Sequence, residues 1–416
     1  MIEPTAHPEN LPDRLTLGPQ SQALARSAFI AGVAGLALSL IAGLMAEQGL
    51  RRFLFAYLVS FCFFLSIALG GLFFVLLQHV TRAGWSVAIR RLAENIAATM
   101  PLFAILAIPV VLSVVFGNGG LYPWARPVTD LQSDPLILAK RPYLNAAFFI
   151  LRLAVYFGFW SLLARWYLKL SAAQDQNADP QLTRKMEIAS APSLVAFGIT
   201  LTTAAFDLLM SLDPHWYSTI FGVYFFAGSA IACYATLILT IYLLQRSGYL
   251  QREISSEHYH DLGKFLFGFT FFWGYIAFSQ YMLIWYASIP EETAWLHRRG
   301  LSTVTGQMNG WTIVSALLLL GQLLIPFAGL LSRQVKRRKT LLTFWAIWAL
   351  AFHWLDLYWL ILPELDGHVH LGLPELGSLV GIGGFFVAAA IRTAARHSLR
   401  PLADPRLEES LAFENI

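Results

Sequence analysis

Two residues within one apolar stretch could together move a proton. His353 and Asp356 are the histidine and the acidic residue of the segment 341–362, and three positions separate them. On a helix this spacing places two side chains about 60° apart on one face, where a carboxylate can orient or charge an imidazole. The pair predicts a proton-accepting site. The alternative is an ion pair or hydrogen bond made only for helix packing, with Arg152 as one candidate partner.

Three further polar residues lie in other apolar stretches at a matching depth. Counting about 1.5 Å per helical residue puts Arg152, Asp207 and Gln280 in the same half of a bilayer as His353 and Asp356. Ionisable groups are costly inside a membrane, so a set at one level predicts a shared polar cavity. We expect His353, Asp356 and Asp207 to act as catalytic proton carriers there. Arg152 and Gln280 would bind the ligand. A helix cap is the alternative for Asp207.

Aromatic side chains are dense on the same side of the predicted membrane. They include Trp216, Tyr217, Trp285, Tyr286, Trp295, Trp311, Tyr358 and Trp359. An interfacial belt explains such a distribution. It would also suit a quinol, because the flat ring needs apolar walls and the hydroxyl groups need bases. We therefore expect a cavity mouth formed by His215, Trp216, Glu291 and Glu364, and we keep the belt as the alternative.

Ligands for an electron-carrying cofactor are scarce. The two cysteines, Cys62 and Cys233, lie inside apolar runs, which excludes a disulfide framework, a thiolate zinc site, a cysteine-ligated iron–sulfur cluster and C-x-x-C-H haem. His79 and His353 lie at different depths, so they do not predict a haem held by two histidines. We expect no metal, haem or iron–sulfur cluster in this chain. Any cofactor would be a non-covalent quinol or menaquinol.

The segments that must position these residues are long and apolar. Of the 416 residues, 57% are hydrophobic and 13% are charged, which leaves too little polar surface for soluble domains. Because the apolar runs are unbroken and do not alternate, they predict transmembrane helices rather than barrel strands. We expect an all-α polytopic protein with ten spans: Ser27–Leu44, Phe53–Val80, Ile96–Phe116, Tyr143–Leu163, Ile188–Leu209, Thr219–Leu244, Leu262–Ser288, Gly306–Leu331, Leu341–Leu362 and Glu375–Ile391.

The basic residues predict the orientation of these spans. The side that holds both termini carries about three times as many lysines and arginines as the other side, which places both termini in the cytoplasm. The loops expected on the outer side are 117–142, 211–218, 289–305 and 363–374. The predicted organisation is one transmembrane domain, residues 27–391, between a cytoplasmic N-terminal segment, 1–26, and a cytoplasmic tail, 392–416.

Four aromatic-rich segments resemble a known family. They are FCFFLSIALGGLFFVLLQHVTRAGW (61–85), SLDPHWYSTIFGVYFFAG (211–228), FSQYMLIWYASIPEET (278–293) and LDLYWLILPE (355–364). They resemble the NrfD-like, polysulfide-reductase-type membrane subunits of alternative complex III, the bacterial quinol:cytochrome c oxidoreductase, and most closely its ActF-type subunits. The likeness extends from about Arg26 to Arg392.

This resemblance implies ten helices, eight of them in two four-helix bundles, in a bacterial inner membrane. It implies partners that carry the metals: a multihaem cytochrome c, a monohaem cytochrome c and an iron–sulfur protein related to molybdopterin enzymes. A paralogous NrfD-like subunit, usually credited with quinol oxidation, and phospholipids complete the expected partners, and no nucleic acid is among them. The implied role is to support quinol binding or proton transfer and to anchor the periplasmic subunits. The alternatives are a purely structural anchor and a secondary transporter.

Overall fold

The computed structural model of the chain describes residues 14–301 and 308–414. These residues form helices joined by turns, and the described part contains no strand beyond an isolated bridge between Arg14 and Tyr249. Parts of four sequence predictions lie outside the described residues: the first half of the N-terminal segment 1–26, the end of the loop 289–305, the first two residues of the span Gly306–Leu331, and the last two residues of the tail.

Ten helices or helical runs in the described part are long and apolar enough to cross a membrane. Six are single helices, two are helices followed by a short helical extension, and the other two are interrupted. They are α1 (Gln20–Met45), α2 (Leu50–Val80), the run α3 (Val87–Ala97), α4 (Met100–Leu106) and α5 (Ile108–Phe116), then α8 (Ala146–Asn177), α9 (Pro180–Leu208), α10 (Phe221–Arg246), α11 (Ser256–Ala287), the run α13 (Gly310–Leu318) to α14 (Ile325–Leu331), α16 (Lys339–Ile361) and α18 (Leu373–Ala394). The ten predicted spans and the all-α multi-pass class are confirmed.

Several helices are longer than their apolar cores. The span predicted as Tyr143–Leu163 is a helix that continues to Asn177, and the next begins at Pro180 rather than Ile188. The extensions carry charged residues, which end an apolar run without ending a helix. Gln174 binds Thr183 across the turn at 2.7 Å, and the Asp179 side chain caps α9. The predicted loop 164–187 is therefore mostly a helical hairpin.

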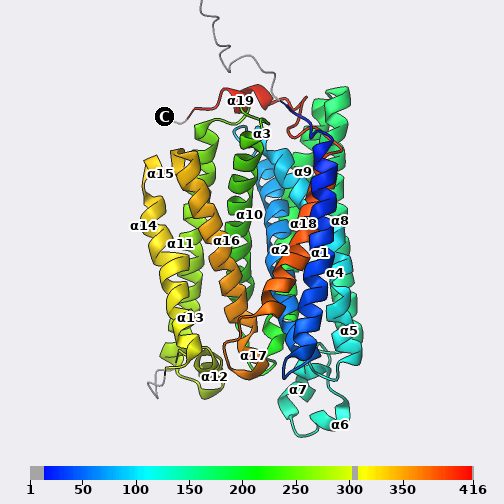
Figure 1. The fold of residues 1–416 in the computed structure, drawn as a ribbon, viewed down its shortest axis with the longest axis vertical. Helices are drawn as coiled ribbons and strands as arrows, with labels where there is room; N and C mark the ends of the chain where they lie inside the picture. Colours follow the sequence, from blue (N-terminus) through cyan, green and yellow to red (C-terminus); the bar gives the residue numbers. More distant parts are fainter. Residues whose placement is uncertain (1–13, 302–307, 415–416) are drawn as a thin grey trace, which may run out of the picture.

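The bundle has two distinct ends (Figure 1). We call the end where α1 begins and α18 finishes the terminal end; the C-terminal helix α19 (Leu407–Leu411) also lies there. The distal end carries the short helices α6 (Val128–Leu131), α7 (Pro135–Lys140), α12 (Pro290–Arg298) and α17 (Pro363–Asp366). A further short helix, α15 (Arg333–Arg337), joins α14 to α16 at the terminal end.

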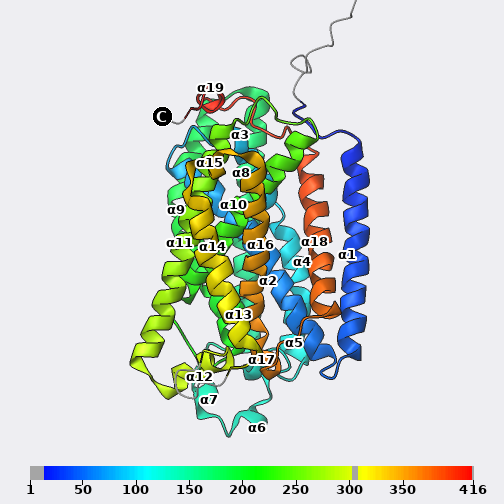
Figure 2. The same cartoon turned by 60° about the vertical axis from the view of Figure 1, so that its left-hand side comes forward.

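Helix α2 is almost wholly buried in the bundle, whereas α1 stands at its rim and packs chiefly on α18 (Figure 2). Glycines make this contact close. A Cβ atom at Gly35 would lie 2.6 Å from the backbone nitrogen of Gly381, so the two backbones meet where no larger side chain fits. The small residues on the facing sides of α1 and α18, such as Gly32, Gly35 and Gly381, therefore serve helix packing.

The tail after α18 is folded onto the terminal end. The backbone N–H of Leu399 donates to the carbonyl of Leu15 at 2.7 Å. The Ser410 hydroxyl in α19 donates to the Trp85 carbonyl at 2.7 Å and accepts from the Ala88 N–H at 3.1 Å. The residues predicted as a separate tail thus cover the start of α3.

Candidate functional site

Arg152 and Asp207 form a buried bidentate ion pair near the distal end of α8 and α9. Arg152 donates from Nε and Nη2 to the two carboxylate oxygens, each at 2.8 Å, and the Tyr156 hydroxyl donates to Oδ2 at 2.9 Å. The remaining guanidinium nitrogen donates to the Tyr143 carbonyl at 2.9 Å. Asp207 is wholly buried, and both of its oxygens accept from donors. The structure thus brings these two predicted residues together, and each neutralises the other.

Aromatic rings separate this pair from the surroundings. The Arg152 guanidinium lies 3.8 Å from the centroid of the Tyr143 ring and 4.4 Å from that of Phe148. Tyr143 lies at the end of the loop before α8, so its ring covers the pair from the distal side. Cation–π attraction is strongest where water is excluded, so this arrangement further stabilises the cation.

A cleft of about 370 Å³ lies next to Tyr143 at the distal end. Its walls come from the end of α7, the loop that leads to α8, the last turn of α9 and the chain that follows α9. The lining side chains are mainly apolar or aromatic, and include Tyr143, Phe206, Met210, Trp216 and Tyr217. Predicted mouth residue Trp216 is thus part of the wall. Its ring stacks on Trp295 of α12, with centroids 4.2 Å apart.

Two charged groups, Lys140 and Asp213, line the same cleft. The Lys140 ammonium donates to the Pro214 carbonyl at 2.6 Å and lies 5.7 Å from the Tyr217 ring centroid. Burial lowers the pKa of Lys140, although nearby Asp213 and Asp134 oppose that shift. A hydrogen-bond donor beside stacked rings suits an oxygen of a flat aromatic ligand.

His215 lies on the rim of this cleft, between Pro214 and Trp216. Its Nε2 atom is 2.7 Å from Asp134 Oδ2, and about half of its side chain is exposed. Burial alone would raise the pKa of Asp134, but the backbone N–H of Ile137 and the His215 ring outweigh it, so that pKa is lowered. This predicted mouth residue therefore carries a carboxylate partner that sequence reasoning did not identify.

Glu364, another predicted mouth residue, binds two arginines. Arg299 donates to Glu364 at 3.1 Å and to the Leu360 carbonyl at 2.7 Å, and its guanidinium lies 3.5 Å from the Trp295 ring centroid. Arg298 contacts both Glu364 and the cleft residue Asp213. Burial lowers the pKa of Arg299 to about 10, with Glu364 opposing the shift. Sequence reasoning missed both arginines, because they look like ordinary charges in a loop.

His353 and Asp356 occupy a second polar site, deeper along α16. The Ser66 hydroxyl of α2 is 2.8 Å from His353 Nε2, and His353 Nδ1 is buried without a hydrogen-bond partner. Asp356 accepts from the Trp273 indole at 3.2 Å and from the Tyr224 hydroxyl. The expected contact, with Asp356 holding the imidazole, is not among the hydrogen bonds of the described residues. Aromatic donors on α10 and α11 take the carboxylate instead.

The two remaining predicted residues lie apart from these groups. Gln280 accepts from the Ser218 hydroxyl at 3.0 Å, between α11 and the loop before α10. Glu291 is exposed in the first turn of α12, where a negative charge favours the helix dipole. The structure therefore divides the predicted cluster. The distal cleft and the ion pairs near it contain Arg152, Asp207, His215, Trp216 and Glu364. His353 and Asp356 form the inner site. Their catalytic and binding roles stay predictions.

A charged cluster at the terminal end lies in residues that the sequence analysis left outside the second and third predicted spans. Arg91 donates to Glu94 at 3.0 Å, to Asp175 at 2.9 Å and to the carbonyl of Ser171 at 3.0 Å. Arg90 pairs with Asp404 of the tail. The cluster ties α3 to α8 and to the tail. Both arginines contact Glu94, whose side chain is wholly buried.

Among the described residues no three histidine, cysteine, aspartate or glutamate side chains gather as metal ligands. Comparison of the chain with protein-family models and with curated proteins found no match. Each of the four aromatic-rich segments quoted in the sequence analysis supplies residues to one of the two polar sites or its surroundings: Ser66, Asp213 to Tyr224, Gln280, and Asp356 to Glu364.

Proposed function

We propose that the chain is an NrfD-like integral-membrane subunit of a bacterial quinol:cytochrome c oxidoreductase of the alternative complex III type, and that its distal cleft takes a quinol ring. The observation that carries the proposal is the cleft itself. Aromatic side chains of Tyr143, Trp216 and Tyr217 line a cleft of about 370 Å³ beside one ammonium group, and the family-like segment 211–228 supplies part of its wall. This volume falls in the range of small-molecule pockets.

The chemistry divides between this chain and its partners. Oxidation of a quinol to a quinone releases two electrons and two protons. Lys140 would donate to a quinone oxygen. The His215 and Asp134 pair, 2.7 Å apart on the rim, would accept the two protons one after the other and pass each to the adjacent water. The electrons would go to the haem or iron–sulfur group of a partner docked at the distal end.

The inner site would serve proton transfer in the same scheme. The free Nδ1 atom of His353 can accept a proton, and Asp356 is held by two donors. Replacing Asp356 with asparagine keeps the size of the side chain. We expect normal assembly of the complex with lower turnover. Unchanged turnover in a fully assembled complex would remove this role.

The helix contacts within each half agree with the two-bundle arrangement that the family implies, and α2 and α10 join the two halves by packing on each other. One bundle would contain α2, the α3–α5 run, α8 and α9, which pack on one another in the pairs α2 with α3, α2 with α9 and α8 with α9. The other would contain α10, α11, the α13–α14 run and α16. The α1 and α18 pair would then be the two additional helices. With the basic terminal end in the cytoplasm, the distal end would face the periplasmic subunits.

Binding to the isolated chain tests the quinol site, because turnover of a whole complex would include the paralogous subunit. A menaquinone analogue is titrated into the purified chain in detergent, and calorimetry gives the Kd. Loss of one charged hydrogen-bond donor in Lys140→Gln should raise the Kd about tenfold. The control, Lys169→Gln, changes an exposed lysine of α8 and should leave the Kd unchanged. Equal Kd values for the two variants would refute the assignment of Lys140.

A light-activated azidoquinone gives an independent location. Label should appear on peptides that contain residues 139–144 or 206–217, which line the cleft. Label confined to other segments would place any quinone elsewhere and remove the distal site.

A purely structural anchor is the second candidate, and the saturated ion pairs favour it. Arg152 with Asp207 and Arg299 with Glu364 leave little free acid or base in the distal network. Under this function the cleft variants would bind no quinone analogue, and the ion-pair variants would fail to assemble with partner subunits.

A further inference from the structure

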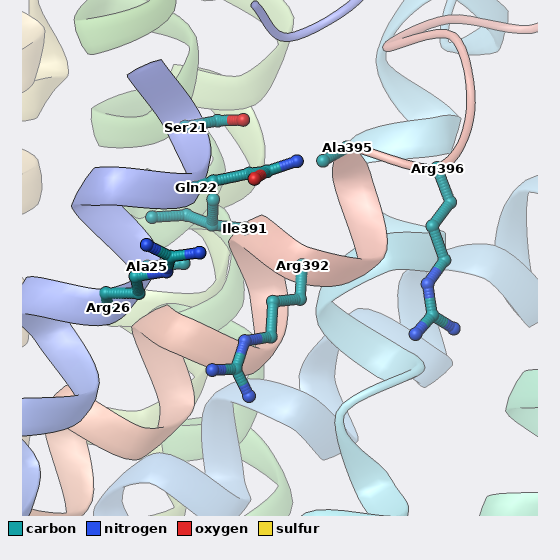
Figure 3. A pocket seen from close by; sticks show the side chains of 8 residues that line it. All are labelled: Ser21, Gln22, Ala25, Arg26, Ile391, Arg392, Ala395 and Arg396. Atoms are coloured by element: carbon teal, nitrogen blue, oxygen red, sulfur yellow. The ribbon is translucent and has the colours of Figure 1, made fainter. Parts of the chain in front are cut away.

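A second cleft lies at the opposite end of the molecule, between α1 and α18. Its volume is about 400 Å³. Ser21, Gln22 and Arg26 of α1 form one side, and Arg392 of α18 with Arg396 just after it form the other (Figure 3). The two helices pack through glycines farther along, and here, where longer side chains replace the glycines, they leave an open space.

Three guanidinium groups of this cleft have no anionic partner in the described part of the chain. Arg26, Arg392 and Arg396 are exposed, and none makes an ion pair or side-chain hydrogen bond there. Arg392 contacts only the face of the Phe29 ring, 5.6 Å from its centroid. By contrast, Arg152 and Arg299 at the distal end are paired with carboxylates. The cleft is therefore an uncompensated positive site.

The helix geometry adds to this positive potential. The first turn of α1 begins at the cleft and contains no acidic residue. The partial positive charge at a helix N-terminus attracts an anion, and here it adds to the three arginines. A phosphate is the natural ligand, because a guanidinium binds its oxygens through two parallel hydrogen bonds.

The location indicates where the phosphate comes from. Arg26 directly precedes the apolar run that begins at Ser27, so the cleft lies at the level where head groups meet hydrocarbon. Below it the outward face of α1 exposes Phe29, Ile30 and Val33, which have 43%, 66% and 49% of their surface accessible. Acyl chains can lie on that face while the head group occupies the cleft.

We propose that the cleft between α1 and α18 binds the phosphate of an anionic phospholipid, such as phosphatidylglycerol or cardiolipin, from the leaflet at the terminal end. The lipid joins the rim helix α1 to α18 through Arg26 and Arg392. Basic pockets between transmembrane helices have the same chemistry wherever they hold such head groups. This proposal is independent of any quinol site.

The test measures lipid binding to the full chain by native mass spectrometry. Purified protein is stripped of lipid in a neutral detergent and titrated with phosphatidylglycerol, cardiolipin or phosphatidylcholine. Anionic lipids should bind more tightly than phosphatidylcholine. The variant Arg26→Gln, Arg392→Gln, Arg396→Gln should lose about fivefold in affinity for each arginine removed. Equal affinity of the wild type for anionic and zwitterionic lipids would overturn the proposal.

A matched variant controls for total charge. Arg165→Gln, Arg184→Gln, Arg246→Gln removes three exposed arginines away from the cleft, and Arg246 also lies over an aromatic ring, 5.9 Å from the Tyr242 centroid. It should keep wild-type affinity at the tightest site. A loss equal to that of the cleft variant would show attraction by net charge alone and refute a specific site.

Inorganic phosphate and glycerol phosphate distinguish the two sources of the ligand. Because neither carries acyl chains, millimolar amounts should displace little phosphatidylglycerol. Saturation of the cleft by inorganic phosphate with the affinity of the lipid would overturn the lipid assignment. The variant Arg26→Lys, Arg392→Lys, Arg396→Lys keeps the positive charge and so controls for misfolding. It should recover most of the lipid affinity. If this folded variant did not recover the affinity, recognition by charge would be refuted.

Discussion

Replacing Arg152 with methionine removes the cation that neutralises Asp207 and keeps most of the volume of the side chain. In the wild type, Asp207 is wholly buried and accepts two hydrogen bonds of 2.8 Å from this arginine. After the substitution the Tyr156 hydroxyl still donates to the carboxylate. A buried carboxylate then remains without a counter-charge.

The size of the effect follows from what is left behind. Removing one partner of a buried ion pair costs about 3 to 5 kcal/mol, whereas replacing both with apolar groups of similar volume is often neutral. Asp207→Leu alone leaves an arginine that still has the Tyr143 carbonyl and two aromatic rings. We therefore expect Arg152→Met to lose the most stability, Asp207→Leu to lose less, and the double variant to recover most of the loss.

Thermal unfolding of the purified proteins in one detergent ranks the stabilities of the wild type and the three variants. Reversible unfolding in mixed micelles gives their free energies of unfolding. The coupling energy of the cycle should be at least about 2 kcal/mol, well above the average of about 0.6 kcal/mol for interhelical hydrogen bonds in a membrane. Additive losses in the double variant, or an Arg152→Met protein as stable as the wild type, would show that the pair does not hold α8 to α9.

Three further outcomes can be measured. Because the pKa of Asp134 is lowered in the folded protein, its ionised form stabilises the fold above the ordinary carboxyl pKa of about 4. This stabilisation is lost as the pH falls through the folded pKa. Between pH 6 and pH 3 the melting temperature of Asp134→Asn should therefore fall less than that of the wild type. Gly35→Ala should lower the free energy of unfolding by about 1 to 3 kcal/mol, because its Cβ would meet the α18 backbone. The control Gly158→Ala has open space at its Cβ and should be neutral or slightly stabilising. Equal melting temperatures of the two variants would contradict the close contact. The variant Gln334→Cys has an exposed thiol at the basic terminal end, so it should react with an impermeant maleimide only in inverted vesicles. Both natural cysteines are buried and should add little signal. Labelling in intact cells would reverse the orientation.

The spans were predictable because hydropathy is a local property of the sequence. The beginning of the third span was not, since Arg90 and Arg91 look like loop residues until their partners are known. Arg91 binds Asp175, 84 positions away, and no periodicity reports such a pairing. The bundle closes around these charges because each is neutralised, which allows them to be buried.

The candidate site was predictable in depth but not in pairing. Counting residues along the helices put Arg152 and Asp207 in the same half of the predicted membrane, but it did not show that they form an ion pair. It could not show that His353 would contact Ser66, an uncharged residue 287 positions away, or that two aromatic donors would occupy Asp356. Which helices are neighbours is decided by packing over the whole molecule, and a single sequence does not contain that information in readable form.

The ion pair between Arg90 and Asp404 also governs the order in which the molecule can be completed. Arg90 emerges from the ribosome 314 residues before its carboxylate partner. Until Asp404 has been synthesised, this buried arginine lacks that counter-charge, so the terminal end of the bundle closes only after the ten apolar helices of the described part have been made. A stop codon just upstream of Asp404 would leave the ten apolar helices of the described part intact but would remove the partner of Arg90. The terminal end of the bundle could then not close, and cellular quality control should degrade the product.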